Sequence, residues 1–153
     1  MRIVIGGDHA GFPMKAPIVK ALREWGHDVT DVGTHSADQV DFPDIADAVC
    51  ERVRTGQADR GIMVCGTGVG AAIAANKFPG IRAALAHDAH SAHQCVEHDD
   101  VNVLCLGAKI VGEWLAIDLV RTFLDARFED TEWYRRRIAK LAAIERRFGG
   151  GRG

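Results

Sequence analysis

The residue most suited to chemistry is Cys65, which stands between an apolar run at residues 61–64 and a glycine-rich segment at residues 66–70. This pattern predicts a strand that ends at the thiol and then turns into a helix. A helix N-terminus carries unpaired N–H groups and a partial positive charge, which favour the thiolate of a nearby cysteine. We therefore interpret Cys65 as a base or a nucleophile. The alternative is a small apolar side chain buried at a strand end.

Three glycines, Gly66, Gly68 and Gly70, follow the cysteine with one residue between each. Glycine lets the backbone approach a ligand closely and directs N–H groups toward an anion. The segment also satisfies the G-x-G-x-x-A pattern of dinucleotide-binding turns, but that pattern normally follows the first strand of its domain. A tight structural turn without a ligand is the third alternative. The cysteine directly before the glycines favours a substrate-binding loop.

Two further positions carry side chains that transfer protons. Asp8 and His9 follow the first apolar run, residues 2–6, within a glycine-flanked segment. A carboxylate beside an imidazole can move protons or bind sugar hydroxyls, and the alternative for Asp8 is a cap on the next helix. His98 lies in a polar segment that we expect to form a turn before the fifth strand. A lone histidine in such a turn is usually only solvated.

The elements that position these residues alternate between strand and helix. Apolar runs predict strands at residues 2–6, 28–32, 61–64, 81–85 and 101–106. Helical spacing predicts helices at residues 13–25, 44–54, 71–76, 89–97, 111–124 and 131–147. This alternation is typical of a parallel sheet with helices on both faces, so we expect a three-layer α/β/α Rossmann-like fold with five parallel strands. We expect a single domain at residues 1–148 and a disordered glycine-rich tail at residues 149–153.

Open parallel sheets bind ligands beyond the carboxyl ends of their strands, where the strand order reverses. The first and third strands would be neighbours at that point, in a 2-1-3 order. Asp8 and Cys65 follow these two strands directly, so we expect both side chains to face one crevice.

Composition narrows the class of protein. The chain has 153 residues, of which 47% are hydrophobic and 26% are charged, with a formal net charge of −2. This balance is that of an ordinary globular domain and gives no sign of a nucleic-acid partner. No apolar run approaches the roughly 20 residues of a membrane span, and the N-terminus lacks the pattern of a signal peptide. We therefore expect a cytoplasmic protein.

Cysteine and histidine are the candidate metal ligands. The four cysteines are Cys50, Cys65, Cys95 and Cys105. None belongs to a C-x-x-C pair, so we expect reduced thiols rather than a zinc or redox motif. His87, His90 and His93 are spaced for one helix face, but no H-E-x-x-H motif accompanies them. We therefore expect neither a metal nor another cofactor.

Two segments of the chain resemble a known family. Residues 7–11, Gly-Asp-His-Ala-Gly, and residues 65–77, Cys-Gly-Thr-Gly-Val-Gly-Ala-Ala-Ile-Ala-Ala-Asn-Lys, are similar to type B ribose-5-phosphate isomerases. That family also includes allose-6-phosphate and galactose-6-phosphate isomerases, and the likeness covers nearly the whole chain. It implies an α/β fold and a homodimer with active sites at the subunit interface, and a tetramer made of two such dimers is the open alternative. It also implies metal-free interconversion of an aldose phosphate and a ketose phosphate through a cis-enediolate.

The resemblance implies roles for individual residues. Cys65 matches the base that moves a proton between C1 and C2, because the cysteine is retained and Ala71 stands where one branch of the family carries a glutamate. Thr67 and His98 match residues that help to open the sugar ring. Asp8 matches a group that contacts the sugar oxygens.

The remaining residues implied by the match bind the substrate. They are His9, Gly66, Gly68, Gly70, Asp99, Lys109, Arg136 and Phe42. His9 and Arg136 would hold the phosphate, with Arg136 supplied by the partner subunit. Lys109 stands where the family often has an arginine.

Three positions depart from the family pattern. Phe42 replaces a common tyrosine and so removes a hydroxyl, and Asp99 replaces an asparagine with a carboxylate that would repel an enediolate. Glu132 replaces a phosphate-binding arginine and is spaced to pair with Arg136 at i, i+4. These departures loosen the substrate assignment: ribose 5-phosphate is the first expectation from the resemblance, and another sugar phosphate or a free sugar is the alternative. A non-catalytic sugar-phosphate-binding subunit is the third reading, against which the retained Cys65 argues.

Overall fold

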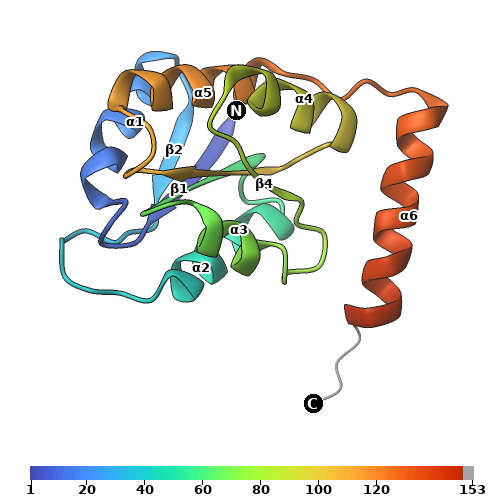
Figure 1. Cartoon of the computed structure of the whole chain (residues 1–153), viewed down its shortest axis with the longest axis horizontal. Coiled ribbons are helices and arrows are strands. Elements are labelled where there is room, and N and C mark those ends of the chain that lie inside the picture. The colour runs from blue at the N-terminus through green and yellow to red at the C-terminus, as the bar shows by residue number, and fades with distance from the viewer. Residues whose placement is uncertain (150–153) are drawn as a thin grey trace.

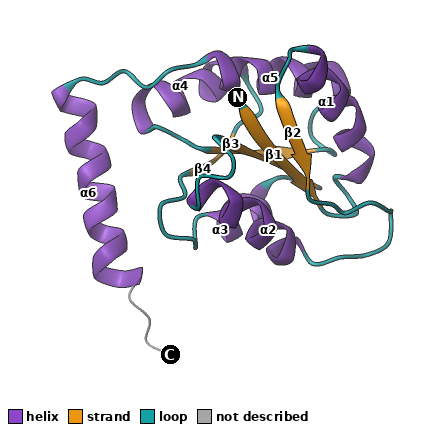
Figure 2. Cartoon of the chain, turned by 180° about the vertical axis from the view of Figure 1, so that it is seen from behind, coloured by secondary structure: helices purple, strands orange, loops and turns teal. Residues whose placement is uncertain are grey.

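The computed structural model describes residues 1–149 as five strands and six helices (Figures 1 and 2). The strands are β1 (Arg2–Gly7), β2 (Asp28–Asp31), β3 (Arg60–Cys65), β4 (Ala83–Leu85) and β5 (Val103–Gly107). The helices are α1 (Phe12–Glu24), α2 (Phe42–Arg54), α3 (Val69–Ala75), α4 (Ala89–Asp99), α5 (Glu113–Asp125) and α6 (Glu132–Gly149). The five strands form one parallel sheet in the order β2-β1-β3-β5-β4.

The sheet separates two apolar cores. Ile3 and Ile5 of β1 pack with α1, α4 and α5 on one face, whereas Val4 between them packs with α2 and α3 on the other. This alternation follows from the two-residue period of a strand that is buried on both sides. Figure 1 shows the two helical layers above and below the sheet. The prediction of a three-layer α/β/α fold is confirmed.

The register of the central strands brings their carboxyl ends to one edge. Gly7 of β1 pairs with Val64 of β3, and Cys65 of β3 pairs with Gly107 of β5. The chain passes from β1 to β2 on one side and to β3 on the other, so the strand order reverses between β1 and β3. The predicted 2-1-3 order is confirmed, and the loops after β1 and β3 lie at the point where such sheets bind ligands.

Several element boundaries differ from the prediction. Helix α3 begins at Val69 rather than at residue 71, because Gly68 adopts a left-handed conformation with φ of +80° and turns the chain there. Strand β4 begins at Ala83 rather than at residue 81, because the N–H of Arg82 donates to the Asn102 side chain instead of continuing a strand.

The prediction of a turn at His98 was wrong. Helix α4 continues to Asp99 and ends only at Asp100, which has φ of +48°. His98 therefore lies in the last turn of a helix and not in a loop before β5.

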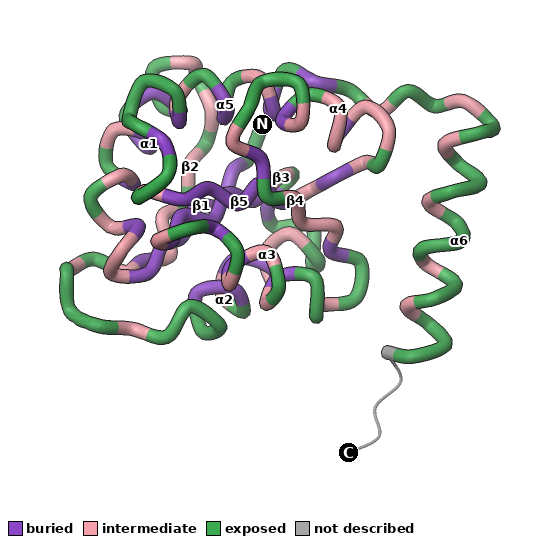
Figure 3. Tube along the Cα trace, viewed as in Figure 1, coloured by how far each residue is buried: buried purple, intermediate pink, exposed green. Residues whose placement is uncertain are grey.

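Helix α6 stands apart from the rest of the domain, on the side where α4 lies (Figures 1 and 3). Most of its residues are exposed, including apolar ones. Gly149 is the last residue of this helix, and the rest of the predicted tail, residues 150–153, lies outside the described residues. Within the described chain, no helix has the length and apolar character needed to cross a bilayer.

Candidate active site

Cys65 is the last residue of β3 and is 6% exposed. Its Sγ accepts a hydrogen bond from the backbone N–H of Gly68 at 3.0 Å. This contact depends on the left-handed turn at Gly68, where an added Cβ would overlap Leu85 and come within 3.0 Å of the Leu106 carbonyl carbon. The glycine thus aims an N–H group at the sulfur, and a donor in this position stabilises negative charge on it.

The loop after β1 packs directly against this thiol turn. Gly11 is so close to the end of β3 that an added Cβ would overlap the Val64 carbonyl and lie 3.0 Å from the Cys65 nitrogen. The N–H of Asp8 donates to the Val64 carbonyl at 3.2 Å. Only glycine at position 11 permits this approach, which places the Asp8 turn beside the Cys65 turn.

The turn after β5 closes the other side of the thiol. The N–H of Ala108 donates to the Cys65 carbonyl at 2.8 Å, and the N–H of Lys109 donates to the Gly66 carbonyl at 3.0 Å. The aliphatic part of Lys109 would lie within 3.9 Å of a Cβ on Gly66. A cationic side chain therefore lies over the glycine turn, where it can attract an anionic substrate.

Asp8 and His9 are oriented by backbone contacts. Asp8 is 8% exposed, and its Oδ1 accepts from the N–H groups of Ala10 and Gly11 at 3.0 and 2.9 Å. The ring of His9 accepts at Nδ1 from the N–H of Val40 at 3.4 Å, which places Nε2 on the far side of the ring. The cap on the next helix that was considered for Asp8 is not formed, because the N-cap of α1 is Gly11 without a side-chain hydrogen bond; the Asp8 carboxylate instead holds its own turn before that helix.

Thr67, Gly70 and Phe42 complete this edge of the sheet. Thr67 is exposed, and its Oγ1 accepts from the N–H of Val69 at 3.3 Å. The Phe42 ring covers Gly70, where an added Cβ would lie 3.0 Å from the ring. The structure therefore gathers Asp8, His9, Cys65, Thr67 and Lys109, here called the carboxyl-edge group, together with the three glycines and Phe42.

The other expected site residues lie at the opposite edge of the sheet. His98 and Asp99 end α4 just before β5 begins, whereas Cys65 pairs with the last residue of β5. Strand β5 has five residues, so its ends are about 13 Å apart. Arg136 lies on α6, whose N-terminal turn is joined to α4 through the stacked rings of His98 and Tyr134, with centroids 4.4 Å apart. Within a single chain, these residues therefore lie far from Cys65.

We call His98, Asp99, Tyr134 and Arg136 the amino-edge group. The Arg136 guanidinium lies over the Trp133 ring at 4.6 Å. The spacing of Glu132 and Arg136 allowed an ion pair, but within residues 1–149 the structure records none between them. The stacking on Trp133 instead leaves the N–H groups at the edge of the guanidinium available to an anion.

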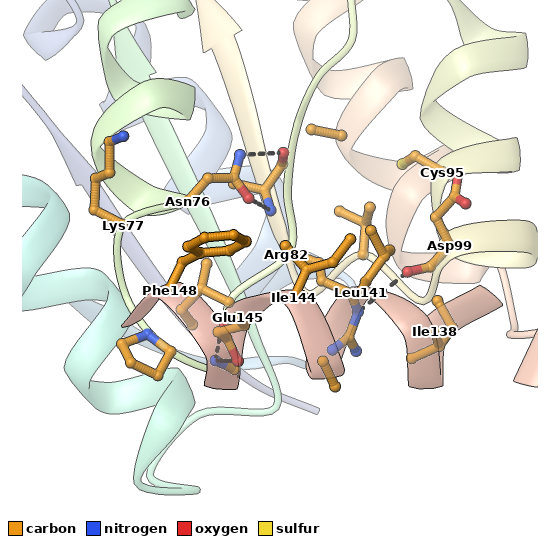
Figure 4. Close-up of a pocket in the computed structure, with 17 residues that line it drawn as sticks. Asn76, Lys77, Arg82, Cys95, Asp99, Ile138, Leu141, Ile144, Glu145 and Phe148 are labelled. Atoms are coloured by element: carbon orange, nitrogen blue, oxygen red, sulfur yellow. Dashed lines mark hydrogen bonds between the residues drawn. The ribbon is translucent and has the colours of Figure 1, made fainter. Parts of the chain in front are cut away.

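A large pocket lies away from the thiol. A groove of about 860 Å³ runs between α6 and the segment around β4 (Figure 4). Ile138, Leu141, Ile144 and Phe148 of α6 line one wall, and Asp99 lies at one end. Because its walls are largely apolar and it holds none of the carboxyl-edge group, we assign it no catalytic role.

Sequence reasoning did not foresee the contacts of three residues beside these groups, of which His87 was considered only as a metal ligand. Tyr134, the one tyrosine of the chain, stacks on His98. His87 accepts at Nε2 from the N–H of Gly107 at 2.9 Å and so supports the strand end opposite Cys65. Lys15 is buried against Gly7. Only Lys15 carried a signal, because it occupies the first position of an i, i+3, i+4, i+7 apolar pattern on α1.

A metal site is not formed by the histidines considered for it. His87 precedes α4 and faces Gly107, while His93 lies 3.4 Å from Glu97 on the helix. Across residues 1–149, no three side chains of His, Cys, Asp or Glu gather closely enough to hold a metal ion.

Comparison with known proteins connects this geometry to a family. Residues 3–141 match the family model described as Ribose/Galactose Isomerase. The chain is 43% identical to ribose-5-phosphate isomerase B of Escherichia coli, over 95% of this chain and 97% of that protein. It is 40% identical to D-erythrulose-4-phosphate isomerase 2 of Mycolicibacterium smegmatis, again over 95% of this chain and 97% of that protein.

A solved structure agrees with both the sequence matches and the fold. Ribose-5-phosphate isomerase B of Clostridium thermocellum superposes with a TM-score of 0.95 at 44% identity, covering 97% of this chain and 99% of that chain. The resemblance inferred from residues 7–11 and 65–77 is confirmed. The chain belongs to the ribose/galactose isomerase family and is an aldose–ketose isomerase.

Proposed function

We propose that the protein interconverts an aldose phosphate and a ketose phosphate through a cis-enediolate, with Cys65 as the base. The observation that carries this proposal is the buried Cys65 thiol, whose Sγ accepts the Gly68 N–H at 3.0 Å beside the Asp8 turn. A base in that position faces the crevice where the strand order reverses.

The proton moves in two steps. The Cys65 thiolate takes the proton from C2 of the open-chain aldose, the electrons form a C1=C2 double bond, and negative charge develops on O1. A proton then passes from O2 to O1, and the Cys65 thiol returns its proton to C1 as O2 becomes the ketose carbonyl. A positioned base of this kind contributes about 10²–10⁴-fold to the rate.

The developing negative charge needs donors that are already in place. Backbone N–H groups of the turn at residues 66–70 and the Lys109 ammonium lie on the side of the crevice next to Cys65. Each preorganised donor to an oxyanion is worth about 2.7–4 kcal/mol in comparable enzymes. Thr67 and Asp8 would contact the sugar hydroxyls, and His9 would bind the phosphate.

A homodimer completes the site. In this proposal the carboxyl-edge group of one subunit meets the amino-edge group of its partner, so that His98 assists ring opening and Arg136 binds the phosphate across the interface. Exposed apolar side chains support this arrangement. Ile73 near the first group is 57% exposed, and Phe148 on α6 is 70% exposed. A second copy of the chain would cover both surfaces. The cytoplasmic location stays a prediction.

Ribose 5-phosphate is the substrate that we propose first, with ribulose 5-phosphate as the product. Named relatives act on sugar phosphates of different length, and the chemistry at C1 and C2 is the same for each. Another sugar phosphate is the alternative, because the Phe42 ring covers Gly70 without a hydroxyl to offer the sugar.

The test is an isomerase assay on purified protein with a panel of substrates. Ribose 5-phosphate, D-erythrulose 4-phosphate, allose 6-phosphate, galactose 6-phosphate and the matching free sugars are compared by kcat/KM. Cys65→Ala is assayed beside Cys95→Ala, a matched control at a half-buried thiol outside the carboxyl-edge group.

We expect Cys65→Ala to lose about 10²–10⁴-fold in kcat while Cys95→Ala retains activity. Preference for one sugar phosphate settles the substrate. Higher kcat/KM for a free sugar than for its phosphate would reject the phosphate-binding part of the proposal. Full activity in Cys65→Ala would reject the thiol as the base.

A further inference from the structure

Lys15 is a buried cation that the proposed chemistry does not use. It is 3% exposed on the face of α1 that also carries Ile18 and Leu22. A charged side chain is rarely buried to this extent unless it is paired, because its desolvation is costly. Its partner is Asp31, the last residue of β2, with which it forms an ion pair.

Asp31 connects Lys15 to the turn that follows β2. The same carboxylate oxygen that accepts from Lys15 also accepts from the N–H of Gly33 at 2.9 Å. The Gly33 carbonyl in turn accepts from the N–H of Gly7 at 2.8 Å, and the N–H of Thr34 donates to the Gly7 carbonyl at 2.6 Å. The ion pair is therefore two hydrogen bonds from the residue that precedes Asp8.

Lys15 also contacts this residue directly. Its Cγ and Cδ would both lie 3.5 Å from a Cβ on Gly7, so the aliphatic stem packs along the end of β1. Beyond Thr34 the same loop continues to Val40, whose N–H donates to Nδ1 of His9 at 3.4 Å. Both the backbone before Asp8 and the ring of His9 thus depend on a loop that the Lys15–Asp31 pair fixes.

We propose that Lys15 is a positioning residue for the anionic end of the substrate. Its ion pair with Asp31 holds the turn at residues 33–34 against Gly7, and so sets the placement of Asp8 and the His9 ring. This inference rests on the proposed function, in which Asp8 and His9 bind the sugar phosphate. Lys15 itself touches no substrate in this scheme and acts through the loop.

A half-buried cation elsewhere in the fold, Arg60, provides a matched control. The Arg60 side chain donates to the carbonyls of Phe123 and Ala126, at the amino end of β3 and away from Cys65. Arg60→Met removes a partly buried charge and its backbone contacts without touching the loop that orients His9. General destabilisation therefore appears in both variants, and an effect on substrate placement appears only in Lys15→Met.

The test compares Lys15→Met, Lys15→Arg, the double variant Lys15→Met/Asp31→Asn and Arg60→Met. The double variant removes both charges, so that no unpaired, half-buried carboxylate is left behind. For the preferred sugar phosphate we expect Lys15→Met to raise KM about tenfold and change kcat by less than about threefold, since small displacements of binding groups have effects of this size. Lys15→Arg should restore KM, and Arg60→Met should leave it unchanged.

His9→Ala supplies a readout that a merely structural role would not move. If Lys15 acts through the His9 loop, Lys15→Met should change KM clearly less in His9→Ala than in the normal background, and the change that remains is the part that acts through Asp8. An equal change in both backgrounds would overturn the proposal, as would a lowered melting temperature in Lys15→Met with no change in KM.

Amide hydrogen exchange keeps this proposal separate from the proposed function. Peptides covering residues 8–12 and 33–41 should exchange faster in Lys15→Met than in Arg60→Met when the two variants have similar melting temperatures. This measurement needs no substrate, so it holds even for a protein that converts no sugar in the panel. Unchanged exchange in both peptides would show that the ion pair does not position the loop.

Discussion

The four thiols of this chain differ in their surroundings and therefore in their expected chemistry. Burial raises the pKa of Cys50 to about 12 and that of Cys95 to about 11, and it raises the pKa of the Cys105 thiol as well. All three are therefore protonated at neutral pH and react slowly, because the thiolate is the nucleophile. Cys65 differs from them in its direct contact with the Gly68 N–H.

This difference predicts the order of alkylation. With iodoacetamide at about pH 8, we expect Cys65 to be modified first in the folded protein, and isomerase activity to fall in step with that modification. Mass spectrometry of digested samples identifies the residue at each time, and Cys65→Ala serves as the control. Modification of Cys95 before Cys65 would contradict the assignment of Cys65 as the reactive thiol.

The Cys65 turn depends on a left-handed residue, and a matched glycine elsewhere isolates what the turn contributes. Gly68 and Gly26 both have φ of +80°, but an added Cβ meets Leu85 and Leu106 only at Gly68 and nothing within 4 Å at Gly26. An alanine at either position is strained by about 1–3 kcal/mol.

We therefore expect Gly26→Ala to lose about 1–2 kcal/mol of unfolding free energy and to keep its kcat/KM. Gly68→Ala should lose more stability and most of its activity, because the turn must shift and the N–H no longer reaches the Cys65 sulfur. Urea unfolding and the isomerase assay provide the two measurements. Equal effects of the two substitutions on activity would show that the turn is not part of the site.

At the amino end of the sheet, Asp59 makes the stability of the fold depend on pH. The Arg2 side chain and backbone N–H donate to its carboxylate, and these hydrogen bonds lower the pKa of Asp59 below its ordinary value. Since the folded-state pKa is the lower one, the stabilisation is complete above the unfolded-state pKa of about 3.9 and disappears as pH falls through the folded-state pKa.

Asp59→Asn removes this titration while it keeps the shape of the side chain. At about pH 5 to 7, the melting temperature of the variant should be below that of the unsubstituted protein. The difference should shrink below about pH 3. Calorimetry over this pH range checks the prediction. A difference that stays constant down to the lowest pH would exclude Asp59 as its source.

The sequence predicted the elements that build the carboxyl-edge group better than those that build the amino-edge group. Apolar runs that stop at glycine placed Asp8 and Cys65 at strand ends, and parallel topology then brought the two together. The predicted end of α4 was wrong because His98, Asp99 and Asp100 are all polar, and polarity alone does not show at which of them the helix ends. Only the left-handed conformation of Asp100 does so.

The ion pair of Lys15 is a second feature that the sequence could not predict. A lysine in a helix is normally exposed, and its place in the apolar pattern of α1 is visible, but its partner is not. Asp31 lies 16 residues away on another element, and the contact depends on how α1 packs over β2. Spacing along one helix carries no information of that sort.

At the scale of the whole molecule, the length of the sheet separates the two groups of site residues. Cys65 lies at one end of the strands, while His98 and the start of α6 lie at the other. No side-chain rotation spans this gap within one chain, because the sheet and its two cores lie between the groups. The proposed site between two subunits would bring the two groups together.

Mixed dimers test this arrangement directly. Cys65→Ala and His98→Ala homodimers should each be almost inactive, but a dimer with one subunit of each kind contains one site with both residues intact. Co-expression with two different tags and sequential purification isolates that heterodimer, and we expect about half of the unsubstituted activity. A heterodimer as inactive as its parents would mean that each site lies within one chain, whereas an active His98→Ala homodimer would mean that His98 takes no part in catalysis. Activity recovered only at the level of simple contamination by either parent would lead to the same conclusion.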